Sequence, residues 1–307
     1  SQDGPAATAT FNWPWNLDVD ASGRVYVADY LNNKIRLIEN GQVSTFAGTG
    51  AGGALNGPAN AATFSAPHDV AVGLDGTVYV ADTNAHRIRM IKAGVVSTLA
   101  GDGTEGFRDG PAAQAQFNVP YCIAVDAANR VYTRDSGEPR VRLIENGQVT
   151  TLAGDGQVGV LDGPAASAQF VSQGFLAVDS MGKVFTSDIQ AHRIRLIENG
   201  QVSTYAGTGA GASLDGPSDQ AAFNWPAGIA LDSQGRLFVA EFQGFRVRLI
   251  FQGEVKTLAG DGTEGFADGP AEDAQFNMLT GVAVGPDGKV YIAESFAHRV
   301  RVFTPAP

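Results

Sequence analysis

The chain has 307 residues, of which 44% are hydrophobic and 17% are charged, and 39 are glycine. This composition is too apolar for a disordered protein and too rich in glycine for a helical bundle. The 32 acidic and 21 basic residues give a formal net charge of −11, which disfavours binding to nucleic acids and to anionic membrane surfaces.

The single cysteine and the hydropathy pattern exclude further classes of protein. The single cysteine, Cys122, excludes an intrachain disulfide and a zinc cluster with several thiolates. No run of about 18 apolar residues is present, so we expect no membrane insertion, and no motif calls for a cofactor. The acidic pI near 4.7, the low lysine content and the near-absence of cysteine favour a secreted or periplasmic protein, which we expect to be monomeric.

A repeat of 53 residues runs through the whole chain. An apolar residue recurs at this spacing in six copies, and a phenylalanine and an Asp/Asn-Gly-Pro triplet recur with it. The apolar and aromatic positions are Val19, Val72, Val125, Val178, Leu231, Val284, and Phe11, Phe64, Phe117, Phe170, Phe223, Phe276. The unbroken register predicts one domain over residues 1–307.

Each copy contains four strand-sized runs, which in the first copy are residues 16–20, 24–29, 34–38 and 43–47. Turn residues separate them, including Asn40-Gly41, a strong hairpin signal. The second run is apolar on both faces, as in a sheet covered by two neighbours. This pattern predicts an all-β fold, a six-bladed β-propeller with one 53-residue repeat in each blade.

The repeat resembles the NHL repeat. The resemblance rests on Gly-Arg-Val-Tyr-Val-Ala-Asp at 23–29, Ala-His-Arg-Ile-Arg at 85–89 and 191–195, and Val-Ser-Thr-Leu-Ala-Gly at 96–101. It implies a propeller, but NHL propellers include protein-binding sensors, RNA-binding modules and metal-dependent lyases, so it implies no single function. The histidine of the motif is present in three copies and replaced by Asn33, Pro139 and Phe245 in the others.

The sixth copy ends before the residues that would align with the outermost strand of the other copies. Three explanations are open. Residues 1–10 cover the exposed edge, blade 6 has three strands, or the sequence belongs to a longer protein.

Residues repeated in every copy are interpreted as structural. An acid and an arginine recur in all six copies and predict ion pairs and turn caps repeated between blades. They are Asp29, Asp82, Asp135, Asp188, Glu241, Glu294, and Arg36, Arg89, Arg142, Arg195, Arg248, Arg301. His86, His192 and His298 lie in alternate blades, too far apart for one metal ion, and are expected to bond across blades.

Function is expected where the repeat breaks, at the loops that lead into the innermost strands and surround the channel mouth. There the register aligns Trp15-Asn16, His68-Asp69, Tyr121-Cys122, Gly174-Phe175, Ala227-Gly228 and Thr280-Gly281. The first four pairs are bulky or polar and the last two are small, which predicts a ligand site on one side of the mouth. The alternative is that these side chains only plug the channel. A Cys122–His68 nucleophilic pair is weighed against a buried, inert thiol.

Arg134 interrupts a column otherwise filled by alanine or serine. An arginine in a buried strand needs a partner, for which Asp135, Glu138 or a bound anionic ligand is expected. Neighbouring departures from the repeat are Thr133, Thr186, Tyr121, Cys122, Gln173 and Phe175. If this wall is a pocket, Arg134 is partly accessible and binds an acidic group; if it is structural, Arg134 is fully buried.

The sequence therefore predicts a module that binds a small molecule or a protein at the polar side of the channel mouth. The predicted ligand-binding residues are Arg134, Tyr121, Cys122, Gln173, Phe175, His68, Asp69, Asn16 and Trp15. The alternative is a metal-dependent lyase or hydrolase acting in the central funnel, for which only His68, Asp69 and Asn16 are plausible ligands. No metal site is predicted, and whether the protein is an enzyme is left open.

Overall fold

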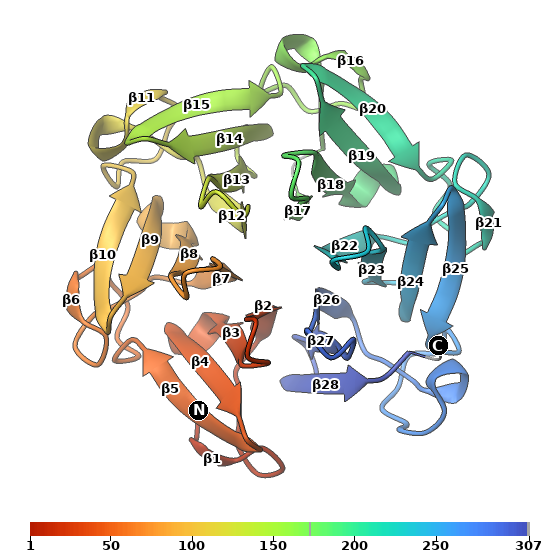
Figure 1. The fold of residues 1–307 in the computed structure, drawn as a ribbon, viewed down its shortest axis with the longest axis horizontal. Coiled ribbons are helices and arrows are strands. Elements are labelled where there is room, and N and C mark those ends of the chain that lie inside the picture. Colours follow the sequence, from red (N-terminus) through yellow and green to blue (C-terminus); the bar gives the residue numbers. More distant parts are fainter. Residues whose placement is uncertain (172, 306–307) are drawn as a thin grey trace.

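A computed structural model describes residues 1–171 and 173–305. In this part of the chain six antiparallel sheets stand around a central axis like blades, in sequence order, with the innermost strands nearest the axis (Figure 1). The predicted six-bladed propeller is confirmed.

Blade 1 shows the pattern that the other blades repeat. Its strands are β1 (Gly4–Pro5), β2 (Pro14–Val19), β3 (Val25–Asp29), β4 (Lys34–Glu39) and β5 (Gln42–Ala47), in the spatial order β1-β5-β4-β3-β2. Asn40 and Gly41 form the turn between β4 and β5 with φ of 49° and 73°. Positive φ at both positions matches the twist of the flanking strands, which is why Asn-Gly is favoured there.

The remaining elements follow the same order. Blade 2 contains β6 (Gly57–Pro58), β7 (Pro67–Val72), β8 (Val78–Asp82), β9 (Arg87–Lys92) and β10 (Val95–Ala100). Blade 3 contains β11 (Gly110–Pro111), β12 (Pro120–Val125), β13 (Val131–Asp135), β14 (Arg140–Glu145) and β15 (Gln148–Ala153). Blade 4 contains β16 (Gly163–Pro164), β17 (Leu176–Val178), β18 (Val184–Asp188), β19 (Arg193–Glu198) and β20 (Gln201–Ala206).

Blade 5 contains β21 (Gly216–Pro217), β22 (Pro226–Leu231), β23 (Leu237–Glu241), β24 (Arg246–Phe251) and β25 (Glu254–Ala259), and blade 6 contains β26 (Leu279–Val284), β27 (Val290–Glu294) and β28 (Arg299–Phe303). Six short 3-10 helices lie in the loops: η1 (Tyr30–Asn32), η2 (Thr83–Ala85), η3 (Ala112–Gln114), η4 (Ala165–Ser167), η5 (Ile189–Ala191) and η6 (Ala271–Asp273). None of these helices of the described chain is long enough to cross a bilayer.

The core lies between neighbouring blades. The second strand of blades 1 to 5 is buried at every residue, on both faces, as its apolar sequence predicts. The repeated phenylalanines Phe64, Phe117, Phe170 and Phe223 are completely buried, so the same large aromatic side chain recurs in the core of blades 2 to 5. Burial of this repeated apolar surface is the main stabilising contribution in a chain with one cysteine.

The repeated acid and arginine form an ion pair within each blade, such as Arg36 Nη1 to Asp29 Oδ2 at 2.8 Å. The same arginine also donates to the Thr10 carbonyl and to Asp3, so it ties the loop before the innermost strand to the third strand. The predicted structural role is confirmed, although each pair lies inside one blade rather than between blades.

Two of the repeated histidines bond across blades, as predicted. His298 Nδ1 accepts a hydrogen bond from the Trp13 backbone N–H at 3.1 Å, and His192 Nδ1 accepts one from Trp225 N–H at 3.3 Å. Asn33 takes the same role toward Ala66 N–H at 2.8 Å. Histidine and asparagine are thus interchangeable here because each offers one acceptor to the next blade.

The ring closes where β26 of blade 6 packs against β2 of blade 1. Ser295, which follows β27, donates from its Oγ a hydrogen bond of 2.6 Å to the Pro14 carbonyl of β2. The N-terminal strand β1 pairs with β5 of its own blade. Residues 1–10 therefore leave the edge of blade 6 uncovered, and the described part of blade 6 has three strands.

Candidate functional site

Aromatic side chains form a nearly continuous series around one end of the channel. Successive ring centroids in this series are 4.3–6.3 Å apart, within the usual range for aromatic contacts. The series runs from blade 4 through blades 3, 2, 1 and 6 to blade 5: Phe175, Tyr121, His68, Trp15, Trp13, Phe296, Phe242, Trp225. We call these residues the aromatic mouth.

A cavity of about 130 Å³ opens inside the aromatic mouth. Its lining residues are Trp15, Tyr121, Gln173, Phe175, Ile189, Trp225, Ala227, Phe242, Thr280 and Phe296. Ala227 and Thr280 hold the register position that Trp15 and Tyr121 occupy in blades 1 and 3, so these small residues of blades 5 and 6 leave space for the cavity. None of the described lining residues is charged.

Four residues predicted for the site line this cavity, namely Trp15, Tyr121, Gln173 and Phe175. Sequence reasoning missed the opposite wall of Ile189, Trp225, Phe242 and Phe296. A signal was present: Ile189 and Phe242 directly follow the repeated acid, where blade 1 has Tyr30, and Trp225 shares its register position with Trp13. The expected polar side is thus an aromatic wall that continues into blades 5 and 6.

His68 lies between aromatic rings rather than in a catalytic pair. Its ring centroid is 4.3 Å from Trp15, 4.3 Å from Tyr121 and 4.9 Å from Tyr30. Burial lowers the pKa of His68 to about 3, because a charged imidazolium has no carboxylate to balance it there. The imidazole is therefore neutral and acts as a flat, uncharged part of the mouth.

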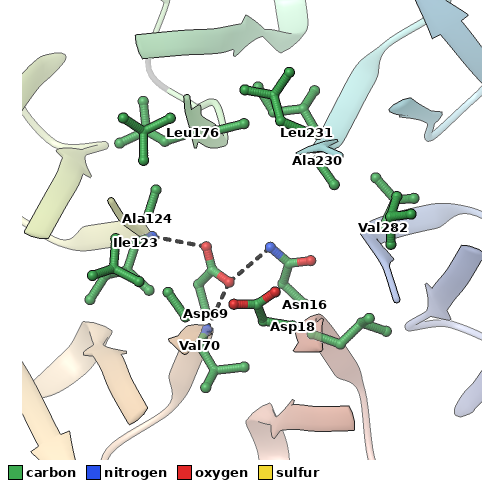
Figure 2. Close-up of a pocket in the computed structure, with 17 residues that line it drawn as sticks. Asn16, Asp18, Asp69, Val70, Ile123, Ala124, Leu176, Ala230, Leu231 and Val282 are labelled. Atoms are coloured by element: carbon green, nitrogen blue, oxygen red, sulfur yellow. Dashed lines mark hydrogen bonds between the residues drawn. The ribbon is translucent and has the colours of Figure 1, made fainter. Parts of the chain in front are cut away.

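Deeper in the channel, Asn16, Asp18 and Asp69 line a second cavity of about 150 Å³, together with aliphatic residues of all six blades (Figure 2). Asp69 Oδ2 accepts a hydrogen bond from Ile123 N–H of the next blade at 2.9 Å, and its Oδ1 accepts from Asn16 Nδ2 at 2.8 Å. Asp18 Oδ2 likewise accepts from Val72 N–H of the next blade at 2.7 Å. These carboxylates tie adjacent innermost strands together.

Burial raises the pKa of Asp18 to about 6, and the nearby carboxylate of Asp20 adds to the effect. The pKa of Asp69 is raised as well, by burial and by Asp18. Two backbone N–H groups hold each carboxylate, but no cation among the described residues pairs with either of them. In a confined space these acids therefore favour the protonated form more than they do in water.

The raised pKa of Asp18 makes the free energy of unfolding depend on pH, and Asp18→Asn is expected to remove this dependence. The folded protein holds the Asp18 proton more tightly than the unfolded chain, so stability falls as pH rises from about 4 to above 6. Asparagine resembles the protonated acid, so it does not ionise. As pH rises across this range, the free energy of unfolding of the variant should exceed that of the natural protein by up to about 3 kcal/mol. Urea unfolding at pH 4, 5, 6 and 7 measures the difference.

The matched control is Asp75→Asn. The hydrogen bond from Lys92 lowers the pKa of Asp75 to about 2, so Asp75 stays ionised in the folded protein throughout this range. The effect of Asp75→Asn on the free energy of unfolding should change little between pH 5 and 7 and shrink only slightly at pH 4, opposite in direction to the effect of Asp18→Asn. An Asp18→Asn effect that is equally independent of pH would contradict the assignment.

Arg134 and Cys122 lie behind the mouth, out of contact with the cavity. Arg134 is 0% exposed, and its guanidinium donates to Thr186 Oγ1, to the Val171 and Ser187 carbonyls and to Asp188 Oδ1. Its carboxylate partner is Asp188 of the next blade rather than the expected Asp135 or Glu138. The expected accessible arginine is not found, because four protein acceptors already surround it.

Gly174 explains how the arginine fits. A Cβ at this position would lie 2.1 Å from Arg134 Nη1 and 2.0 Å from the Ser187 carbonyl oxygen. Only glycine leaves room for the guanidinium there. The small residue in blade 4 is therefore explained by the packing of Arg134 and does not contribute space to the ligand cavity.

The Cys122 thiol is fully buried, and burial raises its pKa well above the ordinary value. We therefore expect no reaction of the native protein with 5,5′-dithiobis(2-nitrobenzoic acid) over an hour at pH 8, and one thiol per chain in 6 M guanidinium chloride. Rapid labelling of the folded protein would contradict this inert role.

A larger hollow of about 570 Å³ lies at the other end of the channel, lined by residues at the turns between the first and second strands of blades 1, 2, 5 and 6. Its acids Asp20, Asp232 and Asp287 are each paired within their own hairpin, with Arg24, Arg236 and Lys289. Within the described residues no three His, Cys, Asp or Glu side chains converge as a metal site. The aromatic mouth is therefore the strongest candidate site.

Family and sequence comparisons agree with this architecture. The NHL repeat family model matches residues 64–89 and 276–303. The chain is 26% identical to NHL repeat-containing protein 2 of Bos taurus and 24% identical to Protein SUPPRESSOR OF QUENCHING 1, chloroplastic, of Arabidopsis thaliana, each over 94% of this chain. It spans 46% and 30% of the length of these two relatives, less than half in both cases.

Solved structures share the fold at low identity. An auxiliary nutrient binding protein from Bacteroides thetaiotaomicron superposes with a TM-score of 0.73 at 14% identity, over 100% of this chain and 72% of that one. A streptogramin B lyase superposes with a TM-score of 0.59 at 14% identity, over 99% of this chain and 97% of that one. At these identities the likeness establishes the fold alone.

Proposed function

The chain is a six-bladed β-propeller with NHL repeats, and from this premise we propose that it is a binding module whose ligand site is the cavity of the aromatic mouth. The observation that carries the proposal is an apolar cavity framed by aromatic rings at one end of the channel. Binding sites are commonly concave and apolar, with a few polar groups that orient the ligand.

The ligand group is neutral and has the size of one six-membered ring. A cavity of about 150 Å³ holds a benzene molecule, and this one has about 130 Å³. The uncharged lining would leave a carboxylate without a partner, because Arg134 is buried behind the wall. Gln173, Thr280 and the Tyr121 hydroxyl are the polar groups available to orient the ring.

The nutrient-binding neighbour from Bacteroides supports a binding role in general, since its propeller covers the whole of this chain. A secreted or periplasmic location belongs to the same proposal, supported by the acidic pI and the single cysteine. Fractionation of cells that produce the protein tests the location. Recovery with the cytoplasm alone would contradict it.

The test uses the chain's own fluorescence. All three tryptophans, Trp13, Trp15 and Trp225, belong to the aromatic mouth, so a change in their emission reports on this site. We expect phenol or methyl glucopyranoside to change the emission saturably, with a Kd between about 10 μM and 1 mM for a ligand of this size. Benzoate should bind at least about tenfold more weakly than phenol, and no saturable response to either neutral probe would contradict the proposal.

We also expect no measurable binding of RNA or DNA at physiological salt, because a chain of net charge −11 has little capacity to displace counterions from phosphates. An electrophoretic shift assay with mixed single-stranded RNA at low and moderate salt tests this. Micromolar binding that weakens steeply with added salt would overturn the expectation.

A further inference from the structure

Asp18 breaks the repeat at a place that the aromatic mouth does not use. In each of the other five blades its register position is an alanine: Ala71, Ala124, Ala177, Ala230, Ala283. Asp18 lies on the innermost strand of blade 1, is only partly buried, and lines the deep cavity of about 150 Å³. One blade therefore places a carboxylate where the repeat otherwise places a methyl group.

Two more polar side chains line the same cavity, Asn16 from blade 1 and Asp69 from blade 2. Figure 2 shows them with Asp18 on one wall, pointing toward the middle of the channel. Asn16 is 7% exposed, and its Oδ1 has no hydrogen-bond partner among the described residues, although its Nδ2 donates to Asp69 Oδ1. A buried acceptor without a partner in the chain indicates a position for a donor from a ligand.

This wall, which we call the acidic wall, consists of Asn16, Asp18 and Asp69, and it offers acceptors and negative charge. Two backbone N–H groups already donate to each carboxylate, one from its own blade and one from the next. None of the described residues that line the cavity is a cation. A ligand that satisfies the acidic wall must therefore donate hydrogen bonds and carry positive charge.

The rest of the cavity suits a hydrocarbon chain. All other described side chains that line it are aliphatic, and they come from all six blades. Leu231 and Val284 line both this cavity and the hollow of about 570 Å³ at the turn end of the channel, so the two spaces adjoin. Val19 also lines the hollow, and Asp18 and Asn16 lie further along the same strand. The hollow thus leads to the acidic wall from the end opposite the aromatic mouth.

We propose that the deep cavity binds a primary alkylammonium group, with its nitrogen at the acidic wall and its alkyl chain among the aliphatic side chains. A primary ammonium has three N–H donors, which match the Asn16 amide oxygen and the two carboxylates. Within the described chain no three His, Cys, Asp or Glu side chains converge, and a carbon chain fits the aliphatic lining better than the water that a hydrated metal ion retains. The site is separate from the aromatic mouth, and neither proposal depends on the other.

The test is isothermal titration calorimetry of the protein with butylammonium chloride at pH 7.5, above the pKa of about 6 to which burial raises Asp18. Butylammonium is slightly smaller than benzene, which a cavity of about 150 Å³ holds. We expect one site with a Kd below about 1 mM. The neutral analogue 1-butanol should bind at least about tenfold more weakly, because it brings no positive charge to the two carboxylates.

Asp18→Asn should weaken butylammonium binding at least about tenfold, because the amide has no charge and turns two N–H donors toward the ligand. The variant should remain folded, since asparagine resembles the protonated acid. Ala230→Leu should also weaken binding, because leucine fills part of the cavity. Asp18 has the same branching at this register position, so the blade accommodates a side chain of that shape.

The matched control is Asp75→Asn, which removes the same charge from a turn of blade 2 that does not line the cavity and should leave the Kd unchanged. Equal affinity for butylammonium and 1-butanol, or equal affinity of the natural protein and Asp18→Asn, would overturn the proposal. Binding of one calcium ion from CaCl₂ that Asp18→Asn abolishes would overturn it too, because the acidic wall would then be a metal site. The tryptophan response to phenol should be unchanged by saturating butylammonium, and competition between the two would place butylammonium in the aromatic mouth instead.

Discussion

Arg134→Ala is expected to lower the free energy of unfolding by about 3–5 kcal/mol. The substitution removes a completely buried guanidinium and leaves Asp188 Oδ1 and the Val171 and Ser187 carbonyls without this donor. In the variant, Asp188 Oδ2 still pairs with Arg195 Nη1 at 2.9 Å. The expected loss of stability therefore comes from removing one of the two cations that pair with Asp188 and from the buried void that the side chain leaves. Thermal and urea unfolding measure it.

Lys289→Ala is the control, because it removes one member of an ion pair whose two side chains are both 47% exposed. Its effect on the free energy of unfolding is expected to be much smaller than that of Arg134→Ala, because solvent screens an exposed ion pair. Both variants should keep the tryptophan response to phenol, since neither side chain lines the cavity. A loss of phenol binding in Arg134→Ala with unchanged stability would instead show that Arg134 belongs to the ligand site.

Ala227→Tyr is expected to weaken phenol binding at least about tenfold, equivalent to about 1.4 kcal/mol. The new ring would occupy the cavity, whose wall at this point is formed by the small side chain of Ala227. Tyr121 holds the same register position in blade 3, so the blade backbone accommodates a tyrosine there. A fluorescence titration measures the loss without adding a fourth tryptophan.

Ala21→Leu serves as the matched control on the opposite end of the channel, where Leu74 holds the same register position in blade 2. It should bind phenol as the natural protein does. If Ala227→Tyr binds phenol normally while remaining folded, the ligand lies elsewhere on the molecule.

The sequence by itself determined the blades. The strands, the Asn-Gly turns and the buried second strand all follow from a pattern that repeats every 53 residues, because every copy supplies the same turn residues and the same apolar faces. The sequence also predicts a turn at Asn199 and Gly200 and burial of Leu196 and Ile197: the turn forms with φ of 52° and 72° and Ile197 is buried, but Leu196 is only half-buried. Local turn preference and hydrophobic alternation are sufficient for such features.

The site depended on contacts between copies, which the repeat does not encode. Register placed Trp15, Tyr121 and Phe175 at the mouth, but only the folded ring brings Phe242 and Phe296 into the same aromatic series. Likewise, Asp188 partners Arg134 from the next blade, and β1 remains on β5 rather than closing blade 6. A repeat specifies where a residue lies in its blade, whereas the packing of one blade on the next decides which side chains meet, and therefore whether an unusual residue is a ligand contact or an internal pair.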